Sequence, residues 1–276
     1  MSRGDRAFLE VSGLRKVLPD GKVLIDEVNF RVETGEFVGL LGATGAGKSL
    51  SLRCVLGLTR ASAGSVRFHD ASSCMREIVG LGGRELRAAR RRMGVIFQGA
   101  NLVRRLTALE NVMIGRVGYM NSLRSWCYGF TDDEARAAWD ALARCNIEHL
   151  AHRVTGSLSG GEMQRVAIAR AIHQAPDLYL ADEPVSSLDP GNARAIMELL
   201  RPLAETNPVL GVFHQPELVA RYCTRVVALK DGRVHYDGAP TLAPALLREI
   251  YGEELSELTA VAASPEDADA GRREIA

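Results

Sequence analysis

The chain has 276 residues, of which 46% are hydrophobic and 25% are charged, and this composition excludes wholesale disorder and a fibrous protein. Its formal net charge is zero, which argues against a protein that coats nucleic acid by bulk electrostatics. We find no run of about 18 apolar residues and no signal-peptide pattern at the N-terminus, so we expect a cytoplasmic chain that does not span a membrane by itself. The five cysteines form no C-x-x-C pair, which predicts reduced thiols.

The hydrophobic pattern predicts alternating strands and helices. Residues 7–32 indicate short strands joined by the turn signal PDG at 19–21. Further apolar strands are predicted at residues 37–41, 65–68, 94–97, 177–181, 208–213, 225–229 and 233–237. Helices are predicted from Lys48 and from Ser159, and at residues 84–92, 107–115, 133–145, 190–205 and 242–250.

Strands that alternate with helices indicate a parallel sheet, and residues of about 100–160 form an all-helical insertion in this pattern. We therefore predict one domain over residues 1–258. Residues 253–276 contain seven acidic residues and two arginines, and from residue 259 the sequence has little to bury. This composition predicts a disordered acidic tail at residues 259–276.

The stretch GLLGATGAGKSL at residues 39–50 follows the apolar run FVGLL. Its glycines allow consecutive N–H groups to turn inward around an anion. Lys48 can then reach the outer phosphates of a nucleotide, and Ser49 can ligate Mg²⁺ at the positive end of the next helix. The pattern G-x-x-x-x-G-K-S predicts a nucleoside triphosphate site formed by Gly42, Ala43, Thr44, Gly45, Ala46, Gly47, Lys48, Ser49 and Leu50.

A second pair of glycines opens the helix that begins at Ser159. Ser159 and Glu162 have the spacing of a capping box, and Met163, Val166, Ala167 and Ala171 predict one buried stripe. Gly160 and Gly161 each cost about 1 kcal/mol in a helix relative to alanine. Either close packing on a neighbour or contact with a ligand would require bare backbone at this helix tip.

The segment LSGGE at residues 158–162 resembles LSGGQ, the signature motif of ATP-binding cassette (ABC) proteins, with Glu162 at the glutamine position. The resemblance covers essentially residues 7–250. It implies an α/β fold of the P-loop NTPase type, in which a mixed or parallel sheet core carries an N-terminal antiparallel β subdomain and an inserted α-helical subdomain. It also implies an ATPase that uses ATP and Mg²⁺.

Further motifs of the family occur in order. LYLADEP at 178–184 looks like the Walker B motif, whose strand delivers Asp182 and Glu183 to the carboxyl edge of the sheet. The resemblance implies that Asp182 holds Mg²⁺ and that Glu183 polarises the attacking water. It also implies catalytic and metal-sensing roles for Gln98 in the Q-loop, a γ-phosphate contact for His214, and a dimer contact for Asp189 in the D-loop.

Two positions depart from the family pattern. Leu18 stands where members usually have an aromatic residue that stacks on adenine. Leu50 stands where they commonly have Thr or Ser, although a backbone N–H can still serve there.

In the family each ATP lies between the phosphate loop of one copy and the signature helix of another. The resemblance therefore implies a homodimer in which Ser159, Gly160, Gly161 and Glu162 contact ATP in trans. It also implies integral membrane permease subunits, an indirect periplasmic or lipoprotein solute-binding protein, and a place on the cytoplasmic face of the inner membrane. No nucleic acid partner is expected.

Residues 101–134 and 213–238 look like phosphonate-import ATPase subunits, which implies an importer for phosphonate or a related phosphorus oxyanion such as a phosphate ester or phosphite. The alternatives are a cassette for another solute, an exporter, or a soluble ABC ATPase of DNA repair or translation. A plain P-loop kinase would not need LSGGE.

Three other clusters have competing interpretations. The aromatic insert at 123–130 either fills the core of the helical insertion or contacts the permease. The arginines between 84 and 92 are interpreted as a solvated helix face and not as a patch for nucleic acid or anionic lipid. Cys145, His149 and His152 have helical spacing, but no fourth metal ligand is evident.

Overall fold

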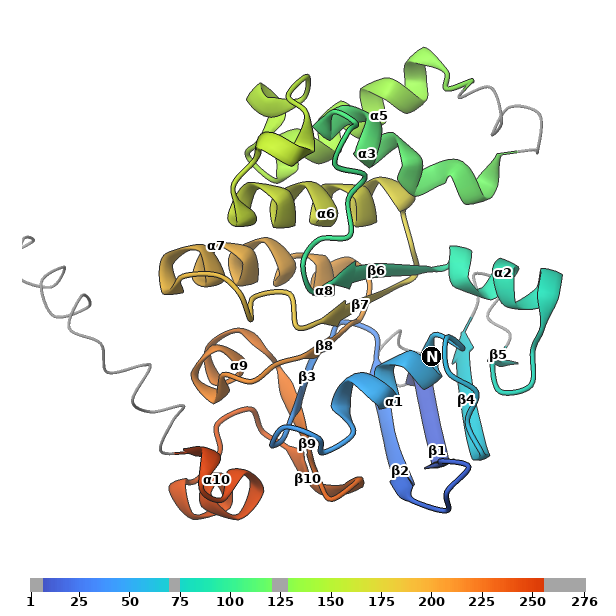
Figure 1. Cartoon of the computed structure of the whole chain (residues 1–276), viewed down its shortest axis with the longest axis vertical. Helices are drawn as coiled ribbons and strands as arrows, with labels where there is room; N and C mark the ends of the chain where they lie inside the picture. The colour runs from blue at the N-terminus through green and yellow to red at the C-terminus, as the bar shows by residue number, and fades with distance from the viewer. Residues whose placement is uncertain (1–6, 70–74, 121–128, 256–276) are drawn as a thin grey trace, which may run out of the picture.

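The computed structural model describes residues 7–69, 75–120 and 129–255. Figure 1 shows two β-sheets in the lower half of the molecule and a group of helices above them. Within these residues, no helix has the length and apolar character needed to cross a membrane. The predicted tail at 259–276 lies outside the described residues, as do Cys74, Cys127 and most of the aromatic insert.

The first sheet is antiparallel and has the strand order β2-β1-β4-β5. Its strands are β1 (Ala7–Val17), β2 (Val23–Glu33), β4 (Ala63–His69) and β5 (Met75–Glu77). β2 alternates buried and exposed residues over most of its length, as expected of a strand with one solvated face.

The second sheet has the order β10-β9-β3-β8-β7-β6, and all its neighbours are parallel except the edge pair β9 and β10. Its strands are β3 (Phe37–Leu41), β6 (Met93–Phe97), β7 (Leu178–Asp182), β8 (Val209–Val212), β9 (Arg225–Lys230) and β10 (Arg233–Gly238). Every residue of β3, β7 and β8 is buried. This is the pattern of central parallel strands that are covered on both faces.

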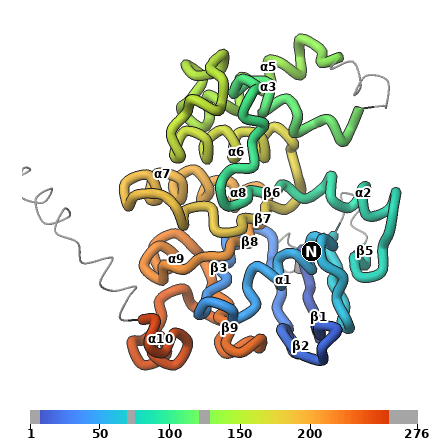
Figure 2. The backbone as a smooth tube through the Cα atoms, viewed as in Figure 1, coloured from blue at the N-terminus to red at the C-terminus, as the bar shows by residue number. Residues whose placement is uncertain are grey.

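The chain between β6 and β7 is helical in its described part, and forms the upper half of Figure 2. It contains α3 (Ala108–Met113), η1 (Ile114–Tyr119), α5 (Asp132–Arg144), η2 (Glu148–Leu150), η3 (Thr155–Ser157) and α6 (Gly160–Gln174). The remaining helices are α1 (Lys48–Val55), α2 (Gly83–Arg91), α7 (Pro190–Leu200), α8 (Leu203–Thr206), α9 (Pro216–Tyr222) and α10 (Pro244–Tyr251). The predicted fold class is confirmed: a mixed sheet carries an antiparallel β layer and an inserted helical segment.

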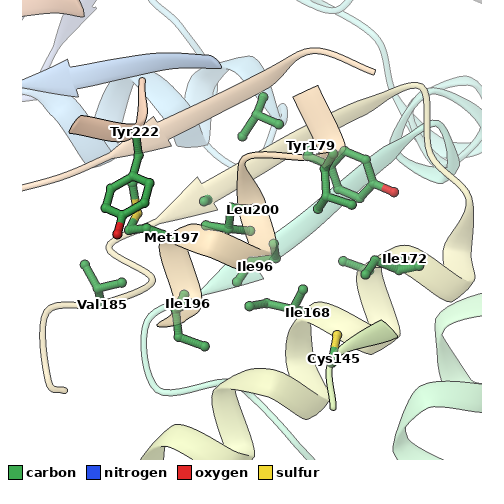
Figure 3. Packing of buried hydrophobic residues seen from close by; sticks show 14 of the residues in the cluster. Ile96, Cys145, Ile168, Ile172, Tyr179, Val185, Ile196, Met197, Leu200 and Tyr222 are labelled. Atoms are coloured by element: carbon green, nitrogen blue, oxygen red, sulfur yellow. The ribbon is translucent and has the colours of Figure 1, made fainter. Parts of the chain in front are cut away.

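The parallel sheet separates two hydrophobic cores. On one face Leu52 and Val55 of α1 pack with residues of the antiparallel sheet. On the other face a single cluster runs from Leu142 of α5, through Ile168 and Ile172 of α6, to Ile96 and Tyr179 of the sheet. Figure 3 shows part of this cluster, including Ile96, Ile168, Ile172 and Tyr179. Because α6 belongs to the same core as the sheet, the helical segment is not packed as a separate unit.

The structure corrects several sequence-based predictions. The single helix expected at 190–205 is interrupted before Pro202, which has no N–H to continue the hydrogen-bond ladder. α9 and β5 have no counterpart in the prediction, because both are short. α6 is buried over more than the predicted stripe, since it contacts the helical segment on one side and the sheet on the other.

The interpretation of the arginines at 84–92 as a solvated helix face is wrong for two of them. Arg90 donates hydrogen bonds to the Leu56 and Gly57 carbonyls, at 2.9 and 2.7 Å. Arg92 forms an ion pair with Asp177. These two side chains therefore join α2 to neighbouring elements.

Candidate nucleotide site

The carboxyl ends of four parallel strands meet at one edge of the second sheet. Phe97 of β6 pairs with Asp182 of β7, which pairs with Val212 of β8, which pairs with Leu40 of β3. The residues that follow these strands therefore leave the sheet at the same edge. They are Gln98, Glu183, His214 and the glycine loop that begins at Gly42, so the topology brings these predicted site residues to one place.

The loop requires glycine at its first position. Gly42 has φ 145°, and a Cβ placed on it would lie 2.2 Å from the Leu229 carbonyl oxygen. Gly47 is the N-cap of α1 with φ 98°, and its Cβ would lie 3.2 Å from the Leu24 carbonyl oxygen. The space around Gly42 excludes a Cβ, and at Gly47 the positive φ and the tight contact both disfavour one, so these glycines set the path of the loop into the helix.

Lys48 is buried at the start of α1 and turns back over the loop. Its Nζ donates to the carbonyl oxygens of Gly42 at 2.7 Å and of Ala43 at 2.9 Å. Burial lowers the pKa of the Lys48 ammonium, while the negative charge of Glu183 acts in the opposite direction. The cation is therefore held at the loop by carbonyl oxygens, which a phosphate group can replace.

Asp182 and Glu183 follow each other at the end of β7 but have different surroundings. Asp182 is 6% exposed, and its Oδ1 has no hydrogen-bond partner among the described residues, while its Oδ2 lies 4.0 Å from Arg53 Nε. Glu183 has a left-handed backbone with φ 51°, which is uncommon for a residue other than glycine. Its Oε1 lies 2.8 Å from Nε2 of His214, so the two predicted catalytic side chains are in direct contact.

The helix tip at Ser159 has the predicted capping box. Ser159 Oγ accepts from the Glu162 N–H, and the Glu162 carboxylate accepts from the Ser159 N–H at 2.7 Å. The hydrogen bonds that the Ser159 N–H and the Ser159 hydroxyl donate to the Glu162 carboxylate lower the pKa of that carboxyl. Ser159 and Gly160 are exposed, so the tip of α6 is available for contact.

The two glycines of the tip serve different purposes. A Cβ on Gly161 would lie 2.8 Å from Asn192 Oδ1 of α7, whereas a Cβ on Gly160 would meet no atom closer than 3.7 Å. Asn192 is itself bound by Asp189, the N-cap of α7, whose Oδ1 accepts from the Asn192 N–H at 3.0 Å. Packing within the chain thus explains Gly161 but leaves Gly160 without a structural reason.

Sequence reasoning missed two residues of α10 and its C-terminal end that contact the loop. The Gly42 N–H donates to Tyr251 Oη at 3.4 Å, and the Thr44 N–H donates to Glu254 Oε2 at 3.0 Å. Burial raises the pKa of the Tyr251 hydroxyl. No local pattern could have found this contact, since about 200 residues separate the partners.

The remaining candidates have the following surroundings. Leu18 is half-buried in the turn between β1 and β2, where its N–H donates to the Lys22 carbonyl. Cys145 is buried, and His152 lies against the Trp139 ring with centroids 5.8 Å apart. Within the described residues there is no group of three or more potential metal ligands of the His, Cys, Asp or Glu type.

Comparison with known proteins agrees with this geometry. Residues 25–186 match the family model described as ABC transporter. The phosphonates import ATP-binding protein PhnC 1 of Rhodopseudomonas palustris (strain HaA2) is 41% identical over 265 residues, which cover 95% of this chain and 91% of that protein. The PhnC protein of Agrobacterium fabrum (strain C58) is 42% identical over 233 residues, with 83% and 80% covered.

Solved structures have the same fold. The ATP-binding cassette MJ0796, solved as a dimer bound to ADP and Pi, is 31% identical with a TM-score of 0.72, and the alignment covers 85% of this chain and 100% of that one. The cbiO1 protein of Clostridium perfringens is 27% identical with a TM-score of 0.74, with 97% and 99% covered. The chain therefore belongs to the ABC transporter family and is an ATP-hydrolysing cassette of that family.

Proposed function

We propose that this chain powers a bacterial importer of phosphonate or a related phosphorus oxyanion by hydrolysing ATP. The observation that carries the ATPase part is the convergence of the glycine loop, Asp182, Glu183 and His214 at one sheet edge. The names of the relatives, which match over most of both chains, support the solute class.

The glycine loop holds the phosphates of ATP. Its N–H groups and the positive end of α1 favour an anion. The Lys48 ammonium exchanges the Gly42 and Ala43 carbonyls for phosphate oxygens. Burial lowers the pKa of the Lys48 ammonium, and the negative charge of a bound triphosphate would act in the opposite direction.

Oxygen donors beside the loop fit Mg²⁺. Asp182 Oδ1 is a buried carboxylate oxygen without a hydrogen-bond partner in the described chain, and it stands at the same edge as Ser49 and Gln98. Hard oxygen ligands together with substrate phosphates are what Mg²⁺ binds in proteins. These three residues would hold the ion, which when bound neutralises phosphate charge.

Glu183 and His214 act on the terminal phosphate. Glu183 is the group placed to accept a proton from the attacking water, and its strained backbone directs the carboxylate out of the strand toward His214. His214 then contacts the γ-phosphate and orients Glu183 through the 2.8 Å contact.

The complete site needs two copies of the chain. α1 packs in one core and α6 in the other, so the glycine loop and the helix tip belong to opposite faces of the same sheet. The exposure of Ser159 and Gly160, and the absence of any close contact that would require glycine at 160, support a contact with ATP held by a second cassette. The dimeric cassette MJ0796 is a precedent for such an assembly.

The permease docks where the helical segment meets the sheet. A cavity of about 370 Å³ there is lined by residues of α2, β6, η1 and α6, including Phe97 and Asn101 beside Gln98. A cytoplasmic helix of the permease seated in it would place the cassette on the inner face of the membrane. The solute-binding protein would act through the permease and not through this chain.

Reconstitution tests the function. The cassette is purified with its membrane partner, inserted into lipid vesicles, and supplied with ATP and radiolabelled methylphosphonate, phosphite, phosphate or a sugar. We expect ATP-dependent uptake of the phosphorus oxyanions only, and none with the Lys48→Ala cassette. Uptake of the sugar alone would reject the solute class, and ATP hydrolysis without any permease-dependent stimulation would reject the importer.

A further inference from the structure

The segment that follows β6 contains an unusual turn directly after Gln98. Gly99, Ala100 and Asn101 all have left-handed backbones, with φ of 72°, 64° and 46°. Only the first is glycine, and Ala100 is 2% exposed. Residues other than glycine rarely adopt this conformation. The Ala100 N–H donates to the Phe97 carbonyl at 3.2 Å and the Asn101 N–H donates to the Gly99 carbonyl at 2.8 Å, and further interactions come from outside the turn.

These interactions come from α6, the helix that begins at the signature tip. Arg170 Nη2 donates to the Ala100 carbonyl at 3.0 Å, and Arg170 Nη1 donates to the Asn101 carbonyl at 2.8 Å. On the other side of Gln98, Gln164 Nε2 donates to the Phe97 carbonyl at 3.4 Å. Two side chains of one helix therefore bind the backbone on both sides of Gln98.

The chemistry of Arg170 suits this task. Its planar guanidinium offers two parallel N–H donors, and hydrogen bonds from a charged donor are stronger than neutral ones. Burial lowers the pKa of the Arg170 guanidinium, because the charged group loses contact with water. The two carbonyl oxygens accept hydrogen bonds in place of that water. A lysine at this position could not form the same two-pronged contact.

Arg170 also lies at the wall of the proposed docking cavity. Arg170 lines that cavity together with Asn101 and Gly115. A Cβ on Gly115 would lie 2.6 Å from the Arg170 carbonyl oxygen, so η1 packs tightly on this turn of α6. Figure 1 shows α6 lying along β6.

We infer that Arg170 is a positioning residue that holds the turn at 99–101 in its left-handed form and thereby sets Gln98 toward the metal and water of the ATP site. This inference rests on the proposed role of Gln98. Through α6, the same residue links Gln98 to the helix tip that meets the second cassette. Arg170 itself touches neither nucleotide nor water in this scheme.

The test compares Arg170→Met with Arg165→Met in the full-length chain. Methionine keeps the length of the side chain but removes the donors. Arg165 is a matched control because it lies on the same helix and donates to a single carbonyl, that of Cys145, away from the turn. For each variant we would measure the ATP dissociation constant with and without Mg²⁺ by fluorescence of a labelled ATP analogue, the steady-state rate against Mg²⁺ concentration, and the melting temperature.

For Arg170→Met we expect the gain in ATP affinity caused by Mg²⁺ to fall about tenfold, with kcat lowered by a similar factor and the Mg²⁺-free affinity changed less than twofold. Arg170→Lys should give an intermediate loss, and Arg165→Met should match the wild type. In a Gln98→Ala background Arg170→Met should add no further loss, because both changes act on the same group.

A wild-type response to Mg²⁺ in Arg170→Met would overturn the inference, and so would losses that multiply with those of Gln98→Ala. If Arg170→Met fails to fold, Arg170→Lys decides, since a wild-type response there shows that the two-pronged contact is not required. If Gln98→Ala itself leaves the Mg²⁺ response unchanged, the proposed role of Gln98 fails and the inference fails with it.

Discussion

The two glycine-rich segments of this cassette differ in how much of their environment comes from the same chain. The loop at 42–49 is enclosed: the Leu229 carbonyl leaves no room for a Cβ on Gly42, Lys48 is tied to loop carbonyls, and α10 reaches the Gly42 N–H. The tip of α6 is open, because Ser159 is exposed and a Cβ on Gly160 would meet nothing closer than 3.7 Å.

Gly42 and Gly160 are therefore required for different reasons. At Gly42 the fold itself leaves no room for a side chain, so glycine would be needed at this position even without a nucleotide. At Gly160 the fold requires nothing, and the cost of glycine in the first turn of a helix is unexplained within one chain. Contact with a second cassette and its bound ATP explains why position 160 is glycine.

The largest expected effect is at the enclosed side of the site. Glu183→Gln removes the carboxylate that accepts the proton, so the rate of ATP hydrolysis should fall by roughly 10²- to 10⁴-fold while ATP still binds. The stalled cassette should accumulate as an ATP-bound dimer. Steady-state hydrolysis and size-exclusion chromatography with ATP measure both effects, and unaltered turnover would reject the role of Glu183.

A second prediction addresses the open side. Ser159→Asp keeps a good helix cap, so α6 should stay folded, but its charge would repel a phosphate of the opposite copy and abolish hydrolysis. Ser159→Asn is the neutral control with the same capping ability and should retain more activity. Circular dichroism melting and ATPase assays measure these outcomes.

Mixing then tests whether the site is shared. Ser159→Asp and Lys48→Ala are each inactive, but a dimer of the two contains one intact composite site. Equal amounts should recover about a quarter of the wild-type rate if the copies pair at random. No recovery in the mixture, or full activity of Ser159→Asp alone, would contradict a site built from two chains.

A third prediction separates the two glycines by stability. Gly42→Ala should lower the free energy of unfolding by about 3 kcal/mol, because the methyl group meets a backbone carbonyl in a strained conformation. Gly160→Ala should leave it within about 0.5 kcal/mol and still reduce ATP hydrolysis about tenfold. Chemical denaturation and ATPase assays distinguish them. Equal loss of stability in both variants would contradict the claim that the fold requires glycine at 42 but not at 160.

The smallest effect is expected at Glu254. Its carboxylate accepts from the Thr44 N–H beside Lys48, where it competes with a triphosphate for positive charge. Glu254→Gln should strengthen ATP binding by about twofold to fivefold, since a partly exposed charge contributes little. Glu205→Gln on α8 is the control. Weaker ATP binding in Glu254→Gln would instead indicate that this contact supports the loop.

Much of the site could be predicted from local patterns. The loop, the capping box and the strand before Asp182 each combine neighbouring residues whose spacing has a direct physical meaning. The strand ends could be expected to converge because parallel strands share one carboxyl edge. Contacts between distant segments could not, as the hydrogen bonds of Tyr251 to Gly42 and of Arg170 to the turn after Gln98 illustrate.

Local sequence patterns are sufficient to locate the phosphate loop, the signature helix and the acidic strand end, because glycine conformations, helix caps and buried strands are local properties. Two contacts could be found only in the folded structure. Tyr251 of α10 accepts a hydrogen bond from the loop, and side chains of α6 bind the backbone on both sides of Gln98. These contacts join residues that are far apart in the chain. They exist only because folding brings α6 and α10, which share one hydrophobic core, beside the strand ends, and no spacing in the sequence encodes that arrangement.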